Sequence, residues 1–190
     1  AVYLIAVGGD GTVNEVLNGI TDFEKVRLGV IASGSGNDFG KGMGILTDPI
    51  VCMRQILKCI RREKHGIPIK KTDLGQVTWG NGKKHRIFGI SAGIGLDAIV
   101  CKKALHSNCK KFLNRIHLGK LTYLALTVQS LFTMDTAEAV VECGDNHKIY
   151  RLHKTIFAAA MNLPAEGGGV PMAPHASCTD GMLSLSSAHG

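Results

Sequence analysis

The sequence has 190 residues, 45% hydrophobic and 19% charged, which is enough for one sizeable or two small domains with a real apolar core. Its apolar runs are far shorter than the roughly 20 residues that cross a bilayer, and its six cysteines and eight histidines contain no CxxC or HExxH pair, so a zinc cluster is not expected. The formal net charge of +7 favours an anionic partner.

The chain opens with a predicted strand at residues 2–7, which runs directly into Gly8-Gly9-Asp10-Gly11-Thr12 and a predicted helix at residues 12–19. Glycines let a ligand approach the main chain, and the amides at a helix start suit a phosphate. A lone carboxylate would repel that phosphate unless Asp10 acts through a cation such as Mg²⁺, or binds a ribose or a water. The hypothesis is a nucleotide site; the alternative is a tight turn in which Asp10 caps the helix.

A second unit of the same kind follows. A predicted strand at residues 27–32 leads into Ser33-Gly34-Ser35-Gly36-Asn37-Asp38-Phe39. In a parallel sheet both turns would lie at the carboxyl edge, where open α/β sheets bind ligands. Neither turn fits GxGxxG, because position 39 is Phe, or the Walker A pattern, because Gly42 stands where Ser or Thr is required.

The character of the chain changes after a predicted helix at residues 49–63. From Pro68 onward short β-type runs dominate, and Asn81-Gly82 predicts a hairpin turn between two of them. One further helix is predicted at Lys120–Phe132. The predicted β runs are 69–79, 86–92, 137–143, 148–161 and 182–185.

Four ordered motifs resemble the diacylglycerol kinase catalytic superfamily, which includes bacterial lipid kinases and sphingosine kinases. They are GGDGTVNEVLNG (Gly8–Gly19), GSGNDF (Gly34–Phe39), the GxGxDA segment Gly93–Ala98, and the stretch from Asn162 through the glycines 167–169 and Ala173-Pro174 to Asp180-Gly181. GGDG alone is shared with NAD kinases and phosphofructokinases, whereas the Asn14-Glu15 continuation and the Asn37-Asp38-Phe39 turn are more specific to the lipid kinases.

The resemblance implies an α/β nucleotide-binding domain followed by a mostly-β, β-sandwich-like domain. We expect a partial ATP-binding domain at residues 1–66 and a partial lipid-binding domain at residues 67–190. Both are expected to be truncated, because the family places a strand-helix-strand portion before GGDGT and an acidic DGE-like motif after the last segment found here.

The activity that the resemblance implies is transfer of the γ-phosphoryl group of ATP, with Mg²⁺, to the hydroxyl of a lipid alcohol, with diacylglycerol favoured. Phosphoryl transfer needs a cradle for the donor phosphates and a cation to neutralise their charge. The predicted nucleotide-binding residues are Gly8, Gly9, Asp10, Gly11, Thr12, Asn14, Glu15, Gly34, Ser35, Gly36, Asn37 and Asp38.

Asp10, Asp97 and Asp73 are the predicted catalytic residues. Asp97 resembles the aspartate that sphingosine kinases use near the lipid hydroxyl, whereas bacterial relatives use the glutamate of the DGE-like motif, which is not found here. Asp73 resembles an aspartate that supports the active-site network of bacterial members; alternatively it ends a strand at a turn. Bacterial relatives also imply a structural cation site formed by Ser177, Asp180 and the carbonyl of Met182, although Asp-Gly is also an ordinary turn.

Basic residues gather in two regions. No acidic residue lies between Ala98 and Met134, where Lys102, Lys103, Lys110, Lys111, Arg115 and Lys120 stand, and a second cluster contains Arg54, Lys58, Arg61, Arg62, Lys64, Lys70 and Lys71. We expect peripheral contact with an anionic membrane, in the cytoplasm; the alternative is a solvated basic face. Nucleic acid is not expected, and the sequence does not determine the oligomeric state.

Three other functions compete with a lipid kinase. An NAD kinase shares GGDG but does not account for GSGNDF, and a non-catalytic nucleotide or lipid sensor would keep every glycine. Gly89-Ile90-Ser91-Ala92-Gly93 fits the GxSxG nucleophile elbow of α/β-hydrolases. The helix that should follow Ser91 would begin with Gly93 and Gly95, however, and this is poor helix sequence. Glu166, before three glycines, is a further cleft candidate.

Overall fold

The computed structural model describes residues 1–45, 48–96, 98–100, 102, 133–144 and 147–189. The chain divides into two compact units, one formed by Ala1–Ala92 with Met161–Ser184 and the other by Gly93–Ala160 with Leu185–Gly190. The elements are β1 (Val2–Gly8), α1 (Asp10–Gly19), β2 (Val26–Ala32), α2 (Asp38–Gly42), α3 (Pro49–Lys64), β3 (Gly75–Trp79), β4 (Lys84–Phe88), β5 (Ser91–Gly95), β6 (Ala137–Cys143), β7 (Lys148–Thr155), β8 (Phe157–Met161), β9 (Ala165–Glu166), β10 (Val170–Pro171) and β11 (Ser184–Ala188).

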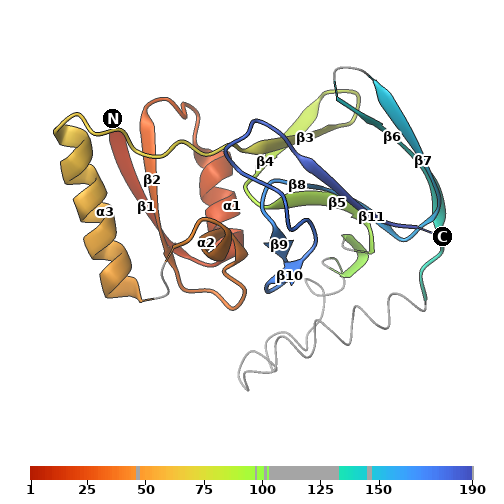
Figure 1. Cartoon of the computed structure of the whole chain (residues 1–190), viewed down its shortest axis with the longest axis horizontal. Coiled ribbons are helices and arrows are strands. Elements are labelled where there is room, and N and C mark those ends of the chain that lie inside the picture. Colours follow the sequence, from red (N-terminus) through yellow and green to blue (C-terminus); the bar gives the residue numbers. More distant parts are fainter. Residues whose placement is uncertain (46–47, 97, 101, 103–132, 145–146, 190) are drawn as a thin grey trace. The chain divides into compact units, whose positions relative to one another are not determined.

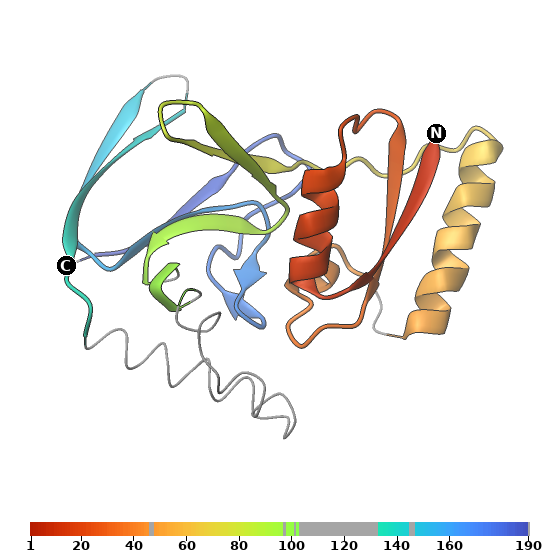
Figure 2. The same cartoon turned by 180° about the vertical axis from the view of Figure 1, so that it is seen from behind.

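The first unit begins with the predicted α/β layers. β1 and β2 pair in parallel, from Val2 opposite Val26 to Gly8 opposite Ala32. α1 covers one face of this pair and α3 the other (Figures 1 and 2). Because the two strands end level with each other, both glycine turns leave the same edge of the sheet, as predicted from the sequence.

Apolar side chains from both ends of the sequence form the core of this unit. Val13 and Leu17 lie four residues apart on α1, so they point to the same side and pack on the sheet. Phe39, the last residue of the second glycine motif, is 6% exposed in the same cluster and therefore anchors that motif to the core. The buried members are Ala6, Val13, Leu17, Val30, Phe39, Leu163 and Cys178.

α3 matches the predicted helix within one residue at either end. It begins with Pro49 behind Asp48, whose side chain accepts a hydrogen bond from the Val51 N–H at 2.8 Å. Ile56 packs over Gly29 of β2, where an added Cβ would lie 2.9 Å from Ile56 Cδ1. An apolar cavity of about 190 Å³ remains between α3 and the two strands, lined in part by Tyr3, Leu28, Ile56 and Ile60.

The short helix α2 was not predicted from the sequence. Residues 33–39 were predicted as one turn, but the turn ends at Asn37, which adopts the left-handed conformation (φ 55°), and a helix begins at Asp38. The side chain of Asn37 closes the turn on itself: its Oδ1 accepts from the Gly34 N–H at 2.7 Å and its Nδ2 donates to the Gly34 carbonyl at 2.8 Å.

The later strands confirm the β-rich prediction, although several begin and end at other residues than predicted. Asn81-Gly82 forms the expected hairpin between β3 and β4, with Gly80, Asn81 and Gly82 all at positive φ. The predicted run 148–161 divides into β7 and β8 at Ile156, two residues after Lys154, which has a φ of 46°. The predicted run 86–92 likewise ends one strand and starts the next, β5. The helix predicted at Lys120–Phe132 lies outside the described residues.

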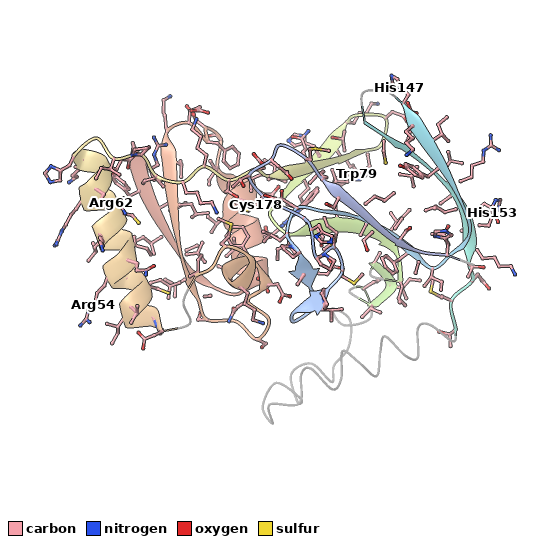
Figure 3. All side chains as sticks on the ribbon, viewed as in Figure 1. Arg54, Arg62, Trp79, His147, His153 and Cys178 are labelled. Carbon is pink, nitrogen blue, oxygen red and sulfur yellow. The ribbon has the colours of Figure 1, made fainter. Side chains whose placement is uncertain are left out.

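The described strands of the second unit form two sheets. A three-stranded sheet has the order β11-β8-β5, and β6 pairs antiparallel with β7 across an irregularity between Ala137 and Ala139. The solvent face of the β6–β7 ribbon carries the ion pair His153–Glu138 at 2.6 Å, and Figure 3 labels His153 there. This mostly-β part agrees with the predicted fold class, whereas the division at residue 66 remains a prediction.

Candidate functional site

The first glycine turn passes from β1 to α1 through Gly8 and Gly9. A Cβ added to Gly8 would lie 2.4 Å from Thr12 Oγ1, so the Thr12 side chain folds back over a position that only glycine can occupy. α1 then begins at Asp10, and the Val13 N–H donates to the Gly9 carbonyl at 3.1 Å. The amides ahead of Val13 have no partner one helical turn back, which is the arrangement that suits an anion.

The second glycine turn lies against the first. The Ser33 N–H donates to the Gly8 carbonyl at 2.9 Å, and a Cβ added to Gly34 would lie 2.5 Å from the Gly9 Cα. Two backbones can approach this closely only because neither residue carries a side chain. The structure thus brings the two turns into direct contact, with Ser35 exposed on the second turn.

Two carboxylates face the same glycine between these turns. An added Cβ on Gly36 would lie 3.0 Å from Asp10 Oδ2 and 3.5 Å from Asp38 Oδ2. The other Asp10 oxygen accepts a hydrogen bond from the Phe39 N–H at 2.9 Å. Asp10 therefore belongs to both turns at once: it starts α1 and caps α2, and one of its oxygens remains directed at Gly36.

Asp38 is held from a distant part of the sequence. It is 6% exposed, and its Oδ2 accepts a hydrogen bond from the Gly168 N–H at 2.6 Å. Its Oδ1 is buried without a hydrogen-bond partner among the described residues and lies 3.7 Å from Lys41 Nζ. A buried carboxylate oxygen without a donor is costly unless a cation or water contacts it.

Sequence reasoning missed Lys41 as a site residue. It lies three residues after Asp38 on α2, and an added Cβ on Gly169 would be 3.8 Å from its Nζ. Its spacing from Asp38 in a helix was the available signal, since residues three apart share a helix face.

The residues present fit a magnesium ion. Mg²⁺ prefers oxygen ligands and is usually held by one or two carboxylates together with substrate phosphates. Asp10 and Asp38 supply such a pair, and no described residue donates a hydrogen bond to the buried Oδ1 of Asp38. Across the described part of the chain, no group of three or more His, Cys, Asp or Glu side chains comes together as a metal cluster.

Asn14 and Glu15 contact a strand rather than the glycine turns. Arg86 of β4 donates to Asn14 Oδ1 from both Nε and Nη2 at 3.2 Å, and also forms an ion pair with Glu15. Asn18, one turn later, donates to the Ile87 carbonyl at 2.9 Å and accepts from the Ile87 N–H at 2.8 Å. These contacts fasten α1 to β4.

Asp73 lies with the predicted cation loop. Its Oδ2 accepts from the Gly181 N–H at 2.8 Å, and its own N–H donates to the Cys178 carbonyl at 2.7 Å. Within that loop the Met182 N–H donates to Asp180 Oδ1 at 3.0 Å, while Ser177 Oγ lies 3.1 Å from Thr179 Oγ1. The structure thus brings Asp73 together with Asp180-Gly181, which sequence reasoning had treated separately.

Ser91 does not lie in a nucleophile elbow. It is the first residue of strand β5, whereas the elbow needs a turn between a strand and a helix. Its hydroxyl donates to Glu166 Oε2, two residues before the Gly168 amide that binds Asp38. Asp97, the predicted acceptor base, lies outside the described residues.

Asn162 is a buried residue that fastens together three segments near Asp73. It is 1% exposed, and its Nδ2 donates to the carbonyls of Asp73 at 3.0 Å and Gly89 at 2.9 Å. One buried amide thus links the connection between β4 and β5, the residue Asp73 and the segment that leads to Gly168. Among the described residues, no helix is long and apolar enough to cross a membrane.

Two family models match this sequence. The model for a diacylglycerol kinase catalytic domain matches residues 1–67, and the model for a YegS C-terminal NAD kinase β-sandwich-like domain matches residues 90–189. The second match covers more than half of the chain.

Individual proteins that resemble this chain carry the family name of the first of these models. A diacylglycerol kinase of Bacillus subtilis (strain 168) is 30% identical over 183 residues, which are 96% of this chain and 53% of the relative. A diacylglycerol kinase of Staphylococcus carnosus (strain TM300) is 40% identical over 75 residues, 39% of this chain and 22% of the relative. A crystal structure of a diacylglycerol kinase from Bacillus anthracis str. Sterne has the same fold, with a TM-score of 0.63 and 24% identity over 98% of this chain and 54% of that one. The chain thus spans about half the length of the first and third of these relatives.

Proposed function

Because the chain belongs to the diacylglycerol kinase catalytic superfamily, we propose that the protein transfers the γ-phosphoryl group of ATP to the hydroxyl of a lipid alcohol, with diacylglycerol as the favoured acceptor. The observation that carries this proposal is the contact between Gly9 and Gly34. It joins two anion-binding turns into one surface, beside two carboxylates directed at Gly36.

The glycine turns act as the phosphate cradle. The amides at the start of α1 would donate to phosphate oxygens, and Thr12 and Ser35 would add hydroxyls. The Ser33 and Gly34 amides of the second turn already donate to the Gly8 carbonyl and to Asn37 Oδ1, so they shape the turn instead. Lys41 lies beside Asp38 and Gly169, where an ammonium group would neutralise charge on the donor phosphates. Glycine at positions 8, 9 and 34 keeps the cradle free of side chains.

Asp10 and Asp38 are the residues that would hold Mg²⁺. The ion, when bound, neutralises phosphate charge during transfer. The chain holds both carboxylates in place beforehand: the Phe39 amide fixes Asp10, and the Gly168 amide fixes Asp38. Asn14 and Glu15 serve the site indirectly in this account, because their contacts with Arg86 fix α1 to β4.

The acceptor side of the reaction involves Asp97 and Asp73. Asp97 is proposed as the base that takes the proton from the lipid hydroxyl. Asp73 is proposed as a positioning residue, because its carboxylate holds the Gly181 amide of the loop with Ser177, Asp180 and Met182. A second cation on that loop would be bound by oxygens of those three residues.

The partners follow from the lipid acceptor. We propose peripheral association with an anionic membrane on its cytoplasmic side, because a lipid alcohol must be taken from a bilayer and the chain carries a net charge of +7. Nucleic acid is not a proposed partner.

A side-by-side transfer assay tests the proposal. Purified protein is given radiolabelled ATP and Mg²⁺ with diacylglycerol, a sphingoid base or NAD, and the labelled product is identified. Label in a lipid phosphate is the expected result. Label in NAD would replace the lipid kinase with an NAD kinase-like enzyme, and ATP binding without transfer to any acceptor would select a non-catalytic sensor.

A further inference from the structure

α3 has an outer face that is not used in the fold. Cys52 and Ile56 point toward the sheet, and residues three, four and seven apart return to the same side of a helix. The opposite side therefore carries Ile50, Arg54, Leu57, Lys58 and Arg61, all exposed. Figure 3 shows Arg54 projecting from the side of α3 that faces away from β1 and β2.

This outer face carries positive charge without acidic neighbours. Between Asp48 and Asp73 the only acidic residue is Glu63. Glu63 is directed inward, since it accepts hydrogen bonds from Arg27 Nε at 2.7 Å and from the Tyr3 hydroxyl at 2.8 Å. None of the ion pairs formed by the described residues includes Arg54, Lys58 or Arg61.

Large apolar side chains share the face with these cations. Ile50 is 66% exposed and Leu57 is 45% exposed, and they lie about two helical turns apart on the same side of α3. Single exposed aliphatic residues are common on protein surfaces, so the informative feature is that these two share one helix face with three cations. Cations at lipid phosphates and aliphatic side chains at the acyl boundary are the combination that binds an interfacial helix to an anionic bilayer.

We propose that the outer face of α3 docks the protein on an anionic phospholipid bilayer. The inference rests on the proposed function to the extent that a lipid acceptor is presented by a membrane. Arg54, Lys58 and Arg61 contact the headgroup phosphates, while Ile50 and Leu57 enter the boundary between headgroups and acyl chains. Glu63, bonded to Arg27 and Tyr3, is kept away from the negative surface.

Vesicle co-sedimentation tests the docking face. The probes are phosphatidylcholine vesicles with and without phosphatidylglycerol, free of diacylglycerol and ATP. The wild type should bind only the anionic vesicles, and more weakly as salt rises. Each cation near such a surface strengthens partitioning about fivefold, so R54E/K58E should bind at least about 25-fold more weakly. I50S/L57S, which changes no charge, should lose about tenfold or more.

A matched control separates this face from net charge. K83E/K84E changes the same number of charges on the exposed β3–β4 hairpin and should bind almost as the wild type does. Equal losses in the two charge-reversal variants, or full binding by I50S/L57S, would overturn the proposal. So would preferential binding of a single-stranded oligonucleotide over the anionic vesicles.

The vesicle result does not depend on phosphoryl transfer. Turnover of a short-chain, water-soluble diacylglycerol by R54E/K58E should equal that of the wild type, because these residues lie outside the glycine turns. If the protein docks but phosphorylates no lipid, the proposed function fails and the docking face stands. If it phosphorylates the soluble lipid but α3 variants dock normally, the docking face is wrong and the kinase proposal stands.

Discussion

The carboxylate of Asp10 accepts a hydrogen bond at 2.9 Å from the backbone N–H of Phe39, so the residue that starts α1 also caps α2. One side chain thereby sets the spacing of the two glycine turns. A substitution at Asp10 can act through this cap, through the charge, or through both, and Asp10→Asn separates the two effects.

Asp10→Asn should abolish phosphoryl transfer with little loss of stability. The Asn oxygen can still accept from the Phe39 N–H, so the cap is kept, but the negative charge for a cation is lost. We expect turnover to fall at least about 100-fold, with a change in stability below the ~1 kcal/mol typical of a lost cap. Steady-state transfer and thermal unfolding measure the two quantities.

Asp22→Asn is the control for that variant, because the Asp22 side chain also accepts from backbone amides, those of Glu24 and Lys25. It lies outside the glycine turns and should leave turnover unchanged. Near-normal turnover of Asp10→Asn would remove the Asp10 charge from the mechanism.

Gly34→Ala should separate the two glycine turns. The new Cβ would lie 2.5 Å from the Gly9 Cα, far inside contact distance, so one backbone must move. We expect a loss of about 1–3 kcal/mol in the free energy of unfolding, as for overpacking, and at least tenfold weaker ATP binding. Chemical denaturation and calorimetric titration with ATP provide the measurements.

Gly19→Ala serves as the matched change, since nothing lies within 4 Å of an added Cβ there. It should keep wild-type ATP affinity and gain a few tenths of a kcal/mol from helix propensity. Unaltered stability and affinity in Gly34→Ala would show that the contact between the turns is dispensable.

Lys41→Ala should weaken the interaction with the donor phosphates. Its ammonium group lies 3.7 Å from Asp38 Oδ1 and beside Gly169, so its removal leaves the buried Asp38 carboxylate without its cation. We expect kcat/KM for ATP to fall about 10- to 100-fold, mainly through KM, and partial recovery in Lys41→Arg. Lys25→Ala removes an equal charge from the exposed pair with Asp22 and should have no effect. A loss as large in Lys25→Ala would point to net charge instead.

The sequence predicted the layers because each element has a local signal. Apolar runs before Gly8 and Ser33 predicted two buried parallel strands, and the helical spacing after Pro49 predicted α3 within one residue at either end. Once these strands were placed side by side, the meeting of the glycine turns followed from geometry alone.

The rest of the site depends on contacts that no local pattern encodes. The Gly168 amide reaches Asp38 across 130 positions of sequence, and Gly181 reaches Asp73 across 108. Arg86, which binds Asn14 and Glu15, comes from β4, and the contact of β4 with α1 is set by tertiary packing. Asn14 and Glu15 were predicted to bind the nucleotide because they follow Gly11 and Thr12 in the motif. Neighbours in the sequence of a helix face different sides of it, however, and the motif does not say which side of α1 each residue faces.

Acid should weaken the fold through Glu63. Hydrogen bonds from Arg27 and then Tyr3 hold the pKa of the Glu63 carboxyl below its ordinary value of 4.5. A pKa that is lower in the folded than in the unfolded state gives stability that is present above the unfolded value and is lost as the pH falls through the folded one. The melting temperature of the wild type should therefore drop below about pH 4.5, and Glu63→Gln should drop less steeply over that interval. Glu24→Gln removes an equal charge from the exposed loop before β2 and should follow the wild-type slope. Parallel slopes in wild type and Glu63→Gln would mean that the bond from Arg27 contributes nothing to acid sensitivity.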